Sequence, residues 1–119
     1  MKTEISLIIP ALNEEDGIVN VIELAKKIFK ENNYEYEIVV VDDGSTDKTR
    51  ELALSQGAKV ISHPHNIGYG RSLKDGIKAS KFDTIVITDS DGTYPLDRLP
   101  SLIKKKKKGF DMIVGQRTG

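Results

Sequence analysis

Apolar and polar positions follow two different periods along this chain. Continuous runs rich in apolar and β-branched residues predict five short strands, at residues 5–9, 36–41, 59–62, 84–88 and 112–115. Between the runs, apolar residues recur every three or four positions, as on one face of a helix. Because continuous apolar runs are typical of strands covered on both faces, the pattern favours a parallel sheet with helices packed on it.

Polar residues at the ends of the periodic segments predict where the helices start and stop. Glu14, Glu15 and Asp16 suit the start of a first helix, which ends near Lys30. Ser45 or Thr46 is expected to cap a second helix, with Asp47 in its first turn, Leu52 and Ala53 facing inward, and Gly57 at its end. Two further helices are expected at 72–80 and 96–108.

Strands that alternate with helices at this spacing indicate right-handed β-α-β units. The expected fold class is therefore α/β, a doubly wound, Rossmann-like three-layer sandwich with a mostly parallel sheet. The sequence contains no internal repeat and no linker, so residues 1–119 are expected to form one domain. The last predicted strand has no helix after it to cover it, and this suggests a truncated domain.

Composition narrows the possible functions. The 119 residues include 18 Lys and Arg and 18 Asp and Glu, so the net charge of zero supplies no long-range field to attract nucleic acid. The absence of Cys excludes disulfides and thiol chemistry and fits a cytoplasmic protein. No stretch reaches the roughly 20 apolar residues that a membrane-spanning helix requires.

In an open α/β sheet, ligands bind beyond the carboxyl ends of the strands, so the residues after each strand carry the most information. Asp89 and Asp91 follow the fourth predicted strand, and two carboxylates one residue apart can share Mg²⁺ or Mn²⁺. Such an ion can bridge a diphosphate and neutralise the charge on a departing phosphate. The alternative is a solvated turn before a helix.

Asp42 and Asp43 end the second predicted strand, where a carboxylate can accept hydrogen bonds from a nucleobase or from ribose hydroxyls. A turn with a helix cap is the alternative. Gly68 and Gly70 form an incomplete dinucleotide fingerprint, so their expected role is close backbone approach or a left-handed turn. Arg71 beside them can pair with a phosphate or remain solvated.

Two further groups of residues have simple interpretations. His63 and His65 flank Pro64 with no carboxylate at ligand spacing, so a surface role is expected for both. The lysines of 104–108 predict a solvated helix face, with contact to an anionic membrane surface as the alternative.

Considered together, five strings at five successive strand ends resemble family 2 glycosyltransferases with the GT-A fold. The resemblance is nearest to the polyprenyl-phosphate type, which includes dolichyl-phosphate mannosyltransferases. The strings are LIIPALNEE, VVDDGSTD, NIGYG, DSDGTYP and VGQR, and they span nearly the whole chain.

The resemblance implies an enzyme that moves a sugar, with inversion, from a nucleotide diphosphate donor (a UDP- or GDP-sugar) to an acceptor such as a polyprenyl or dolichyl phosphate. It assigns nucleotide-sugar binding to Pro10, Ala11, Leu12, Asn13, Glu14, Asp42, Asp43, Gly68, Gly70, Arg71 and Ser90. It assigns catalysis to Asp89, Asp91 and Arg117, with Arg117 meeting the acceptor phosphate or the donor diphosphate, and Mg²⁺ or Mn²⁺ to Asp89, Asp91 and Thr93. It also implies work at the cytoplasmic face of a membrane.

The sequence departs from the family pattern at Ser90, where alanine is commoner, and at Arg71, where a small residue is usual. The family's catalytic domain continues for about another hundred residues, a domain-scale length. One alternative is a haloacid-dehalogenase-like phosphatase, in which Asp89 would attack phosphorus and Asp91 would act as acid and base. Another is a nucleotide-binding fragment without turnover.

Overall fold

The computed structural model describes residues 3–88 and the strand 111–114. Its elements in chain order are β1 (Glu4–Ala11), α1 (Ile18–Glu31), β2 (Glu35–Asp42), α2 (Thr49–Ser55), β3 (Lys59–Ser62), α3 (Tyr69–Ala79), β4 (Thr84–Ile87) and β5 (Asp111–Val114). All five predicted strands are confirmed, with ends that differ by one or two residues. The helix expected at 96–108 lies outside the described residues.

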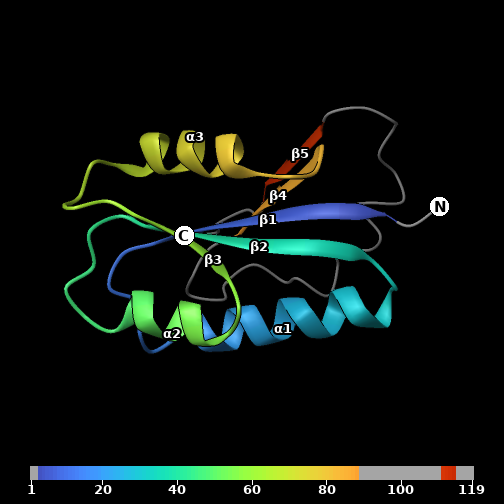
Figure 1. Ribbon diagram of the computed structural model, residues 1–119, viewed down its shortest axis with the longest axis horizontal. Coiled ribbons are helices and arrows are strands. Elements are labelled where there is room, and N and C mark those ends of the chain that lie inside the picture. Colours follow the sequence, from blue (N-terminus) through green and yellow to red (C-terminus); the bar gives the residue numbers. More distant parts are fainter. Residues whose placement is uncertain (1–2, 89–110, 115–119) are drawn as a thin grey trace.

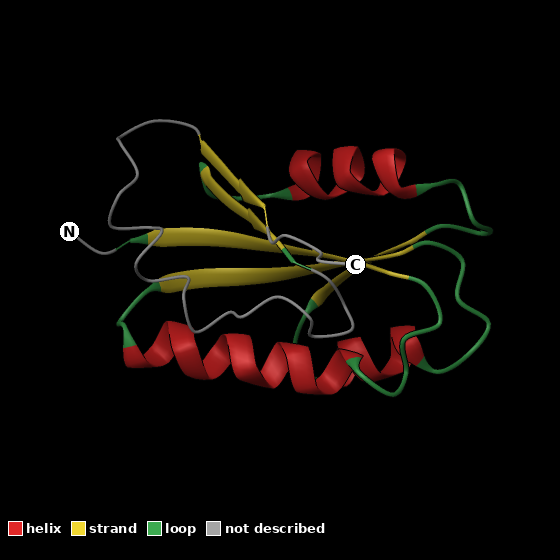
Figure 2. Ribbon diagram, turned by 180° about the vertical axis from the view of Figure 1, so that it is seen from behind, coloured by secondary structure: helices red, strands yellow, loops and turns green. Residues whose placement is uncertain are grey.

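The five strands form one parallel sheet in the order β3-β2-β1-β4-β5. Helices α1 and α2 cover one face and α3 covers the other, as Figures 1 and 2 show from opposite sides. This arrangement confirms the predicted three-layer α/β fold. The direction of strand addition reverses at β1, so the carboxyl ends of β1 and β4 form the topological switch point where ligands bind in such sheets.

Strand β1 lies at the centre of the sheet and is buried on both faces. Ile5, Leu7 and Ile9 pack in the cluster beneath α1 and α2, whereas Ile8 packs in the cluster beneath α3. None of these side chains is exposed to solvent. The alternation follows from the two-residue period of a strand, and it confirms the expected burial of this run on both sides.

Helix α1 buries the predicted apolar stripe, which consists of Ile18, Val21, Ile22, Ala25, Ile28 and Phe29. Its start differs from the prediction, because Glu14, Glu15 and Asp16 precede the helix and no acidic residue occupies its first turn. The carbonyl of Glu14 accepts hydrogen bonds from the amides of Gly17 and Ile18 instead. The acidic segment is therefore part of the loop at the ligand-binding edge.

The prediction that Ser45 or Thr46 caps the second helix is wrong. Helix α2 begins at Thr49 and its N-cap is Lys48, which makes no capping bond through its side chain. Asp47 also lies before the helix, and its carboxylate accepts the amide of Thr49 at 2.9 Å. Ser45 and Thr46 bond to Asn13 instead, so a tertiary contact replaces the expected local one.

Helix α3 starts at Tyr69, three residues before the predicted start, because the amide of Ser72 already bonds to the carbonyl of Gly68. Its close approach to the sheet depends on Gly76. A Cβ at Gly76 would lie 2.7 Å from Cγ2 of Ile8 and 3.2 Å from Cγ2 of Val41. Both neighbours are short, β-branched and buried, so they have little room to move.

Replacing Gly76 by Ala is expected to push α3 away from the sheet and to cost about 1–3 kcal/mol of stability through overpacking. Gly70→Ala provides a matched control, because a Cβ there meets nothing within 4 Å in the same helix. That change is expected to be neutral or to stabilise by up to about 1 kcal/mol. Urea unfolding of both variants measures the difference, and equal stabilities would contradict the packing argument.

Candidate functional site

The loops after β1 and β2 are joined by hydrogen bonds at the carboxyl edge of the sheet. The amide of Asn13 donates to Oγ of Ser45 at 2.8 Å, and Oδ1 of Asn13 accepts the amide of Thr46 at 2.8 Å. Asn13 adopts a left-handed conformation with φ of 53°, which Asn tolerates better than most residues. The pairing holds the predicted Pro10–Glu14 loop in one conformation beside Asp42.

Thr49, the first residue of α2, connects the same two loops through hydrogen bonds. Its side chain is fully buried, and its Oγ1 accepts the amide of Glu14 at 2.8 Å while donating to Oδ1 of Asp47. Burial opposes ionisation of Asp47, but hydrogen bonds from the hydroxyl and amide of Thr49 and the amide of Glu15 hold the pKa of its carboxyl below the ordinary range. The loop after β1 thus rests on the first residue of α2.

The loop after β2 also touches the loop after β3, at Gly44. This residue has φ of +89°, and a Cβ on it would lie 2.5 Å from the carbonyl carbon of His65. Only glycine fits a left-handed conformation with backbone so close. The contact brings the loop that contains Gly68 against the loop that contains Asp42 and Asp43.

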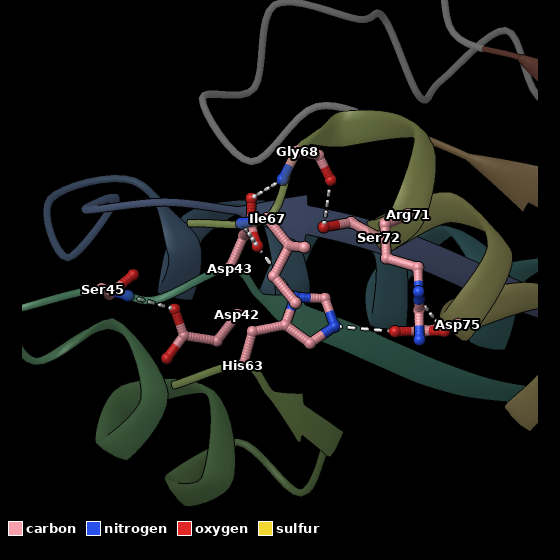
Figure 3. A network of polar contacts seen from close by, with 9 residues as sticks. All are labelled: Asp42, Asp43, Ser45, His63, Ile67, Gly68, Arg71, Ser72 and Asp75. Carbon is pink, nitrogen blue, oxygen red and sulfur yellow. Dashed lines mark hydrogen bonds and ion pairs between the residues drawn. The ribbon is translucent and has the colours of Figure 1, made fainter. Parts of the chain in front are cut away.

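Asp43 takes part in three hydrogen bonds at this edge (Figure 3). Its Oδ1 accepts from the amide of Ile67 at 2.8 Å and faces Nδ1 of His63 at 2.8 Å. Its Oδ2 accepts the amide of Gly68 at 2.9 Å. A carboxylate offers about four lone pairs, and the described part of the chain engages three of them. The fourth, on Oδ2, receives no hydrogen bond from the described residues.

The prediction of a surface role for His63 is wrong. Only 7% of its side chain is exposed, and its Nε2 faces Oδ2 of Asp75 in α3 at 2.7 Å. Because an ionised carboxylate only accepts hydrogen bonds, two such partners require a proton on each ring nitrogen. His63 is therefore an imidazolium that connects the end of β2 to α3.

Contacts among His63, Asp43 and Asp75 shift the pKa of each side chain toward its charged form. The hydrogen bond to Asp43 raises the pKa of His63 above its ordinary value, burial opposes the rise, and Asp75 adds to it. Burial works against ionisation of Asp43, but the amide of Ile67, His63 and the amide of Gly68 hold the pKa of its carboxyl low. The bond from His63 and the neighbouring Arg71 likewise lower the pKa of Asp75.

Sequence reasoning missed His63 and Asp75 because their partners lie 20 and 12 residues away. One signal was available for His63. Strands β2 and β3 pair with Asp42 opposite Ser62, so Asp43 and His63 are the next residues past equivalent positions. Asp75 had no such signal, because its place depends on how α3 crosses the sheet.

The remaining predicted binding residues occupy the same edge. Pro10 and Ala11 end β1, Leu12 is 38% exposed, and Asp42 is buried with Oδ1 accepting the amide of Ser45 at 3.0 Å. Gly68 has the predicted positive φ, at 120°, whereas Gly70 lies inside α3.

Arg71 stands in the first turns of α3 with a mostly exposed side chain, and its Nε lies 3.2 Å from Oδ1 of Asp75. Arg71, Lys74 and Lys78 also line a pocket of about 500 Å³ along this helix, together with Asp75 and Ile77.

The predicted metal and acceptor residues lie outside the described residues; they are Asp89, Ser90, Asp91, Thr93 and Arg117. The last residue before them, Thr88, is buried, and its amide bonds to the carbonyl of Ile8 at 3.1 Å. Its Oγ1 has no hydrogen-bond partner within the described part of the chain. Thr88, the last described residue before Asp89, therefore lies beside β1 at the switch point.

The described residues contain neither a metal-binding cluster nor a membrane-spanning helix. Within residues 3–88 and 111–114, no group of three or more His, Cys, Asp or Glu side chains is arranged to hold a metal ion. No helix among those residues is long and apolar enough to cross a membrane.

Comparison with known proteins gave one protein family. A sequence model described as "Glycosyl transferase family 2" matches residues 6–119. An undecaprenyl-phosphate 4-deoxy-4-formamido-L-arabinose transferase of Pseudomonas fluorescens is 32% identical over 92% of this chain and 34% of its own length. A low-salt glycan biosynthesis hexosyltransferase of Haloferax volcanii is 39% identical over 95% of this chain and 27% of its own. The chain thus spans about a third of the length of these curated relatives.

Solved structures show the same fold. Glucosyl-3-phosphoglycerate synthase from Mycobacterium tuberculosis, in complex with Mn²⁺, UDP and glucosyl-3-phosphoglycerate, superposes with a TM-score of 0.68. It is 35% identical over 87% of this chain and 39% of its own. Mannosyl-3-phosphoglycerate synthase from Rubrobacter xylanophilus reaches a TM-score of 0.70 at 23% identity, over 79% of this chain and 33% of its own, and supports the fold alone.

Thr49→Val should destabilise the edge, because it removes the hydroxyl that accepts the partly buried amide of Glu14. A cost of about 0.5–1.5 kcal/mol is expected for loss of one hydrogen bond of this kind. Thr49→Ser keeps the hydroxyl and serves as the control, with a smaller loss. Chemical unfolding measures both, and a valine variant as stable as the serine variant would refute the role of this bond.

His63→Gln should lose stability in a defined pH window. The contribution from the raised pKa of His63 is fully present below its ordinary value of 6.5 and disappears as pH rises through the folded value. The contributions of Asp43 and Asp75 are present above their ordinary value of 3.8 and disappear as pH falls through their lowered values. The difference between parent and variant in unfolding free energy should therefore peak between those two values. A difference independent of pH from 3 to 9 would exclude the ionic arrangement.

Proposed function

Because the chain belongs to glycosyl transferase family 2, we propose that it binds a nucleotide diphosphate sugar and transfers the sugar to an acceptor with inversion. The observation that carries the proposal is the meeting of the loops after β1, β2 and β3 at the carboxyl edge of the sheet, where the buried Asp43 has one lone pair that receives no hydrogen bond from the described residues. This location is where doubly wound sheets bind nucleotides. The family match runs through all five strand-end strings, whereas the phosphatase alternative accounts for one, so the match favours glycosyl transfer.

In the proposed site, the loop of Pro10, Ala11, Leu12, Asn13 and Glu14 holds the nucleoside. Asp43 accepts a hydrogen bond from the base or ribose, with Asp42 beside it. Support comes from the rigidity of this loop, which is fixed by bonds to Ser45, Thr46 and Thr49. Preorganisation of this kind lowers the entropy that binding costs.

We assign the donor diphosphate to the region of Gly68, Gly70, Arg71 and Ser90. Asp89 and Asp91, with Thr93, would hold Mg²⁺ or Mn²⁺, since carboxylate and hydroxyl oxygens are ligands that these hard cations accept. Such an ion supplies neutralisation of the charge on the leaving nucleotide. The related synthase structures contain Mn²⁺ together with UDP or UDP-glucose, which supports this assignment.

For the acceptor we propose a polyprenyl or dolichyl phosphate, met by Arg117. An undecaprenyl-phosphate transferase and a dolichyl-phosphate beta-glucosyltransferase of Trichomonas vaginalis are among the relatives, the second at 30% identity over 96% of this chain and 39% of its own length. A phosphate acceptor is already an anion and attacks without a general base. The synthases favour phosphoglycerate as a second candidate.

We propose residues 1–119 as the nucleotide-sugar-binding portion of a catalytic domain that acts at the cytoplasmic face of a membrane. Lys104–Lys108 would supply a peripheral contact with anionic lipid. The zero net charge argues against nucleic acid as a partner.

The test is a calorimetric titration of the chain with UDP and GDP, each with and without Mn²⁺. One nucleotide is expected to bind in a metal-dependent manner, and Asp91→Asn should weaken binding at least tenfold, the loss expected when one carboxylate ligand is removed. Asp83→Asn is the matched control, because Asp83 is exposed before the amino end of β4, the same strand that Asp91 follows.

A folded parent that binds neither nucleotide would overturn the proposal. Transfer assays on the intact enzyme with polyprenyl phosphate and 3-phosphoglycerate then separate the acceptors, and transfer to 3-phosphoglycerate alone would contradict the lipid assignment.

A further inference from the structure

The buried His63 belongs to no step of the proposed reaction, although it touches the residue assigned to the nucleoside. We propose that His63 is a positioning residue: as an imidazolium clamped between Asp43 and Asp75, it orients the Asp43 carboxylate toward the nucleoside and makes donor binding depend on its own protonation. This inference rests on the proposed nucleotide site. It adds to that site a residue and a proton to which the proposed function assigns no role.

Three hydrogen-bond donors hold the carboxylate of Asp43. His63 and the amide of Ile67 share Oδ1, and the amide of Gly68 takes one side of Oδ2. These three donors fix the plane of the carboxylate, so the remaining lone pair has one direction. All three bonds end on a carboxylate, but two of the donors are neutral backbone amides of a loop, whereas the bond from His63 joins two opposite charges and is therefore the strongest of the three.

Asp75 contacts the His63 ring at Nε2, on the side away from Asp43. Asp75 accepts from Nε2 of His63 through Oδ2 and from Nε of Arg71 through Oδ1. Charges therefore alternate from Arg71 through Asp75 and His63 to Asp43, as Figure 3 shows from α3 to the end of β2. Arg71 is 61% exposed and weakly held, so the buried His63 makes the main connection between the helix and the nucleoside residue.

The charged groups around His63 determine how nucleotide affinity should change with pH. Among the described residues, the titratable groups that face His63 are Asp43 from the loop after β2 and Asp75 from α3, with Arg71 behind Asp75. Both carboxylates favour the cation. When the ring loses one proton, its positive charge is lost and an unprotonated nitrogen faces Asp43 or Asp75 and repels that carboxylate. The attraction between His63 and Asp43 then weakens and the two backbone amides hold Asp43 less firmly by themselves, so nucleotide affinity should fall as pH rises.

The experiment measures the dissociation constant of whichever nucleotide, UDP or GDP, the parent chain binds with Mg²⁺, from pH 6 to 9. Four proteins are compared: the parent, His63→Gln, Asp75→Asn and His65→Gln. The control His65→Gln changes an exposed histidine of the same loop. Circular dichroism and thermal melting at each pH show that every variant is folded.

The parent and His65→Gln should lose affinity severalfold across the range. His63→Gln should bind about three- to tenfold more weakly at pH 6, as expected for loss of one charge-assisted bond, with a flatter profile. Asp75→Asn leaves both Asp43 and His63 in place but removes one partner of the cation. Its loss of affinity should therefore occur at lower pH than in the parent.

A structural role alone would lower affinity without moving the pH profile, so the profile is the decisive measurement. Parental affinity and profile in His63→Gln would overturn the inference and leave the proposed function intact. If His63→Gln does not fold, an unshifted profile in folded Asp75→Asn overturns it equally. A folded parent that binds neither nucleotide overturns the donor site, and the positioning role with it.

Discussion

Burial of β1 on both faces is the constraint on which the rest of this structure depends. Its fully buried isoleucines and leucine serve the two clusters in alternation, so one set of side chains holds α1 and α2 while the other holds α3. A strand with two apolar faces has no stable place at a solvated edge of a sheet. Strand β1 therefore lies at the centre, the sheet grows to both sides of it, and the switch point forms at its carboxyl end.

The site built there is polar but tightly bonded. The loops after β1 and β2 share hydrogen bonds through Asn13 and Thr49, and Gly44 admits the backbone of the loop after β3. Burying Asp43 would be costly without partners, and two amides with His63 compensate for the lost water. The same bonds that make burial tolerable also fix the position of the carboxylate proposed to bind the nucleoside, so stability and the proposed binding role depend on one arrangement.

This arrangement suits a chain whose total charge is zero. If the proposed nucleotide diphosphate donor binds here, its recognition has to come from short-range groups at the sheet edge, because the chain supplies no long-range field to attract an anion. Family membership and the shared fold of the synthases agree with such a site. The relatives differ in the acceptors that their names give, which fits a common donor-binding half joined to acceptor regions that vary.

The sequence by itself determined the strands, the parallel α/β fold and which of the described residues lie at the carboxyl edge of the sheet, because apolar periodicity and strand ends are local properties of the chain. It did not determine the start of α2, since Ser45 and Thr46 bond to Asn13 rather than to their own helix. Only the tertiary structure decided that His63 is a buried cation. Its partners come from another strand end and from a helix that crosses the opposite face, and their meeting depends on strand register and on how closely Gly76 lets α3 approach the sheet.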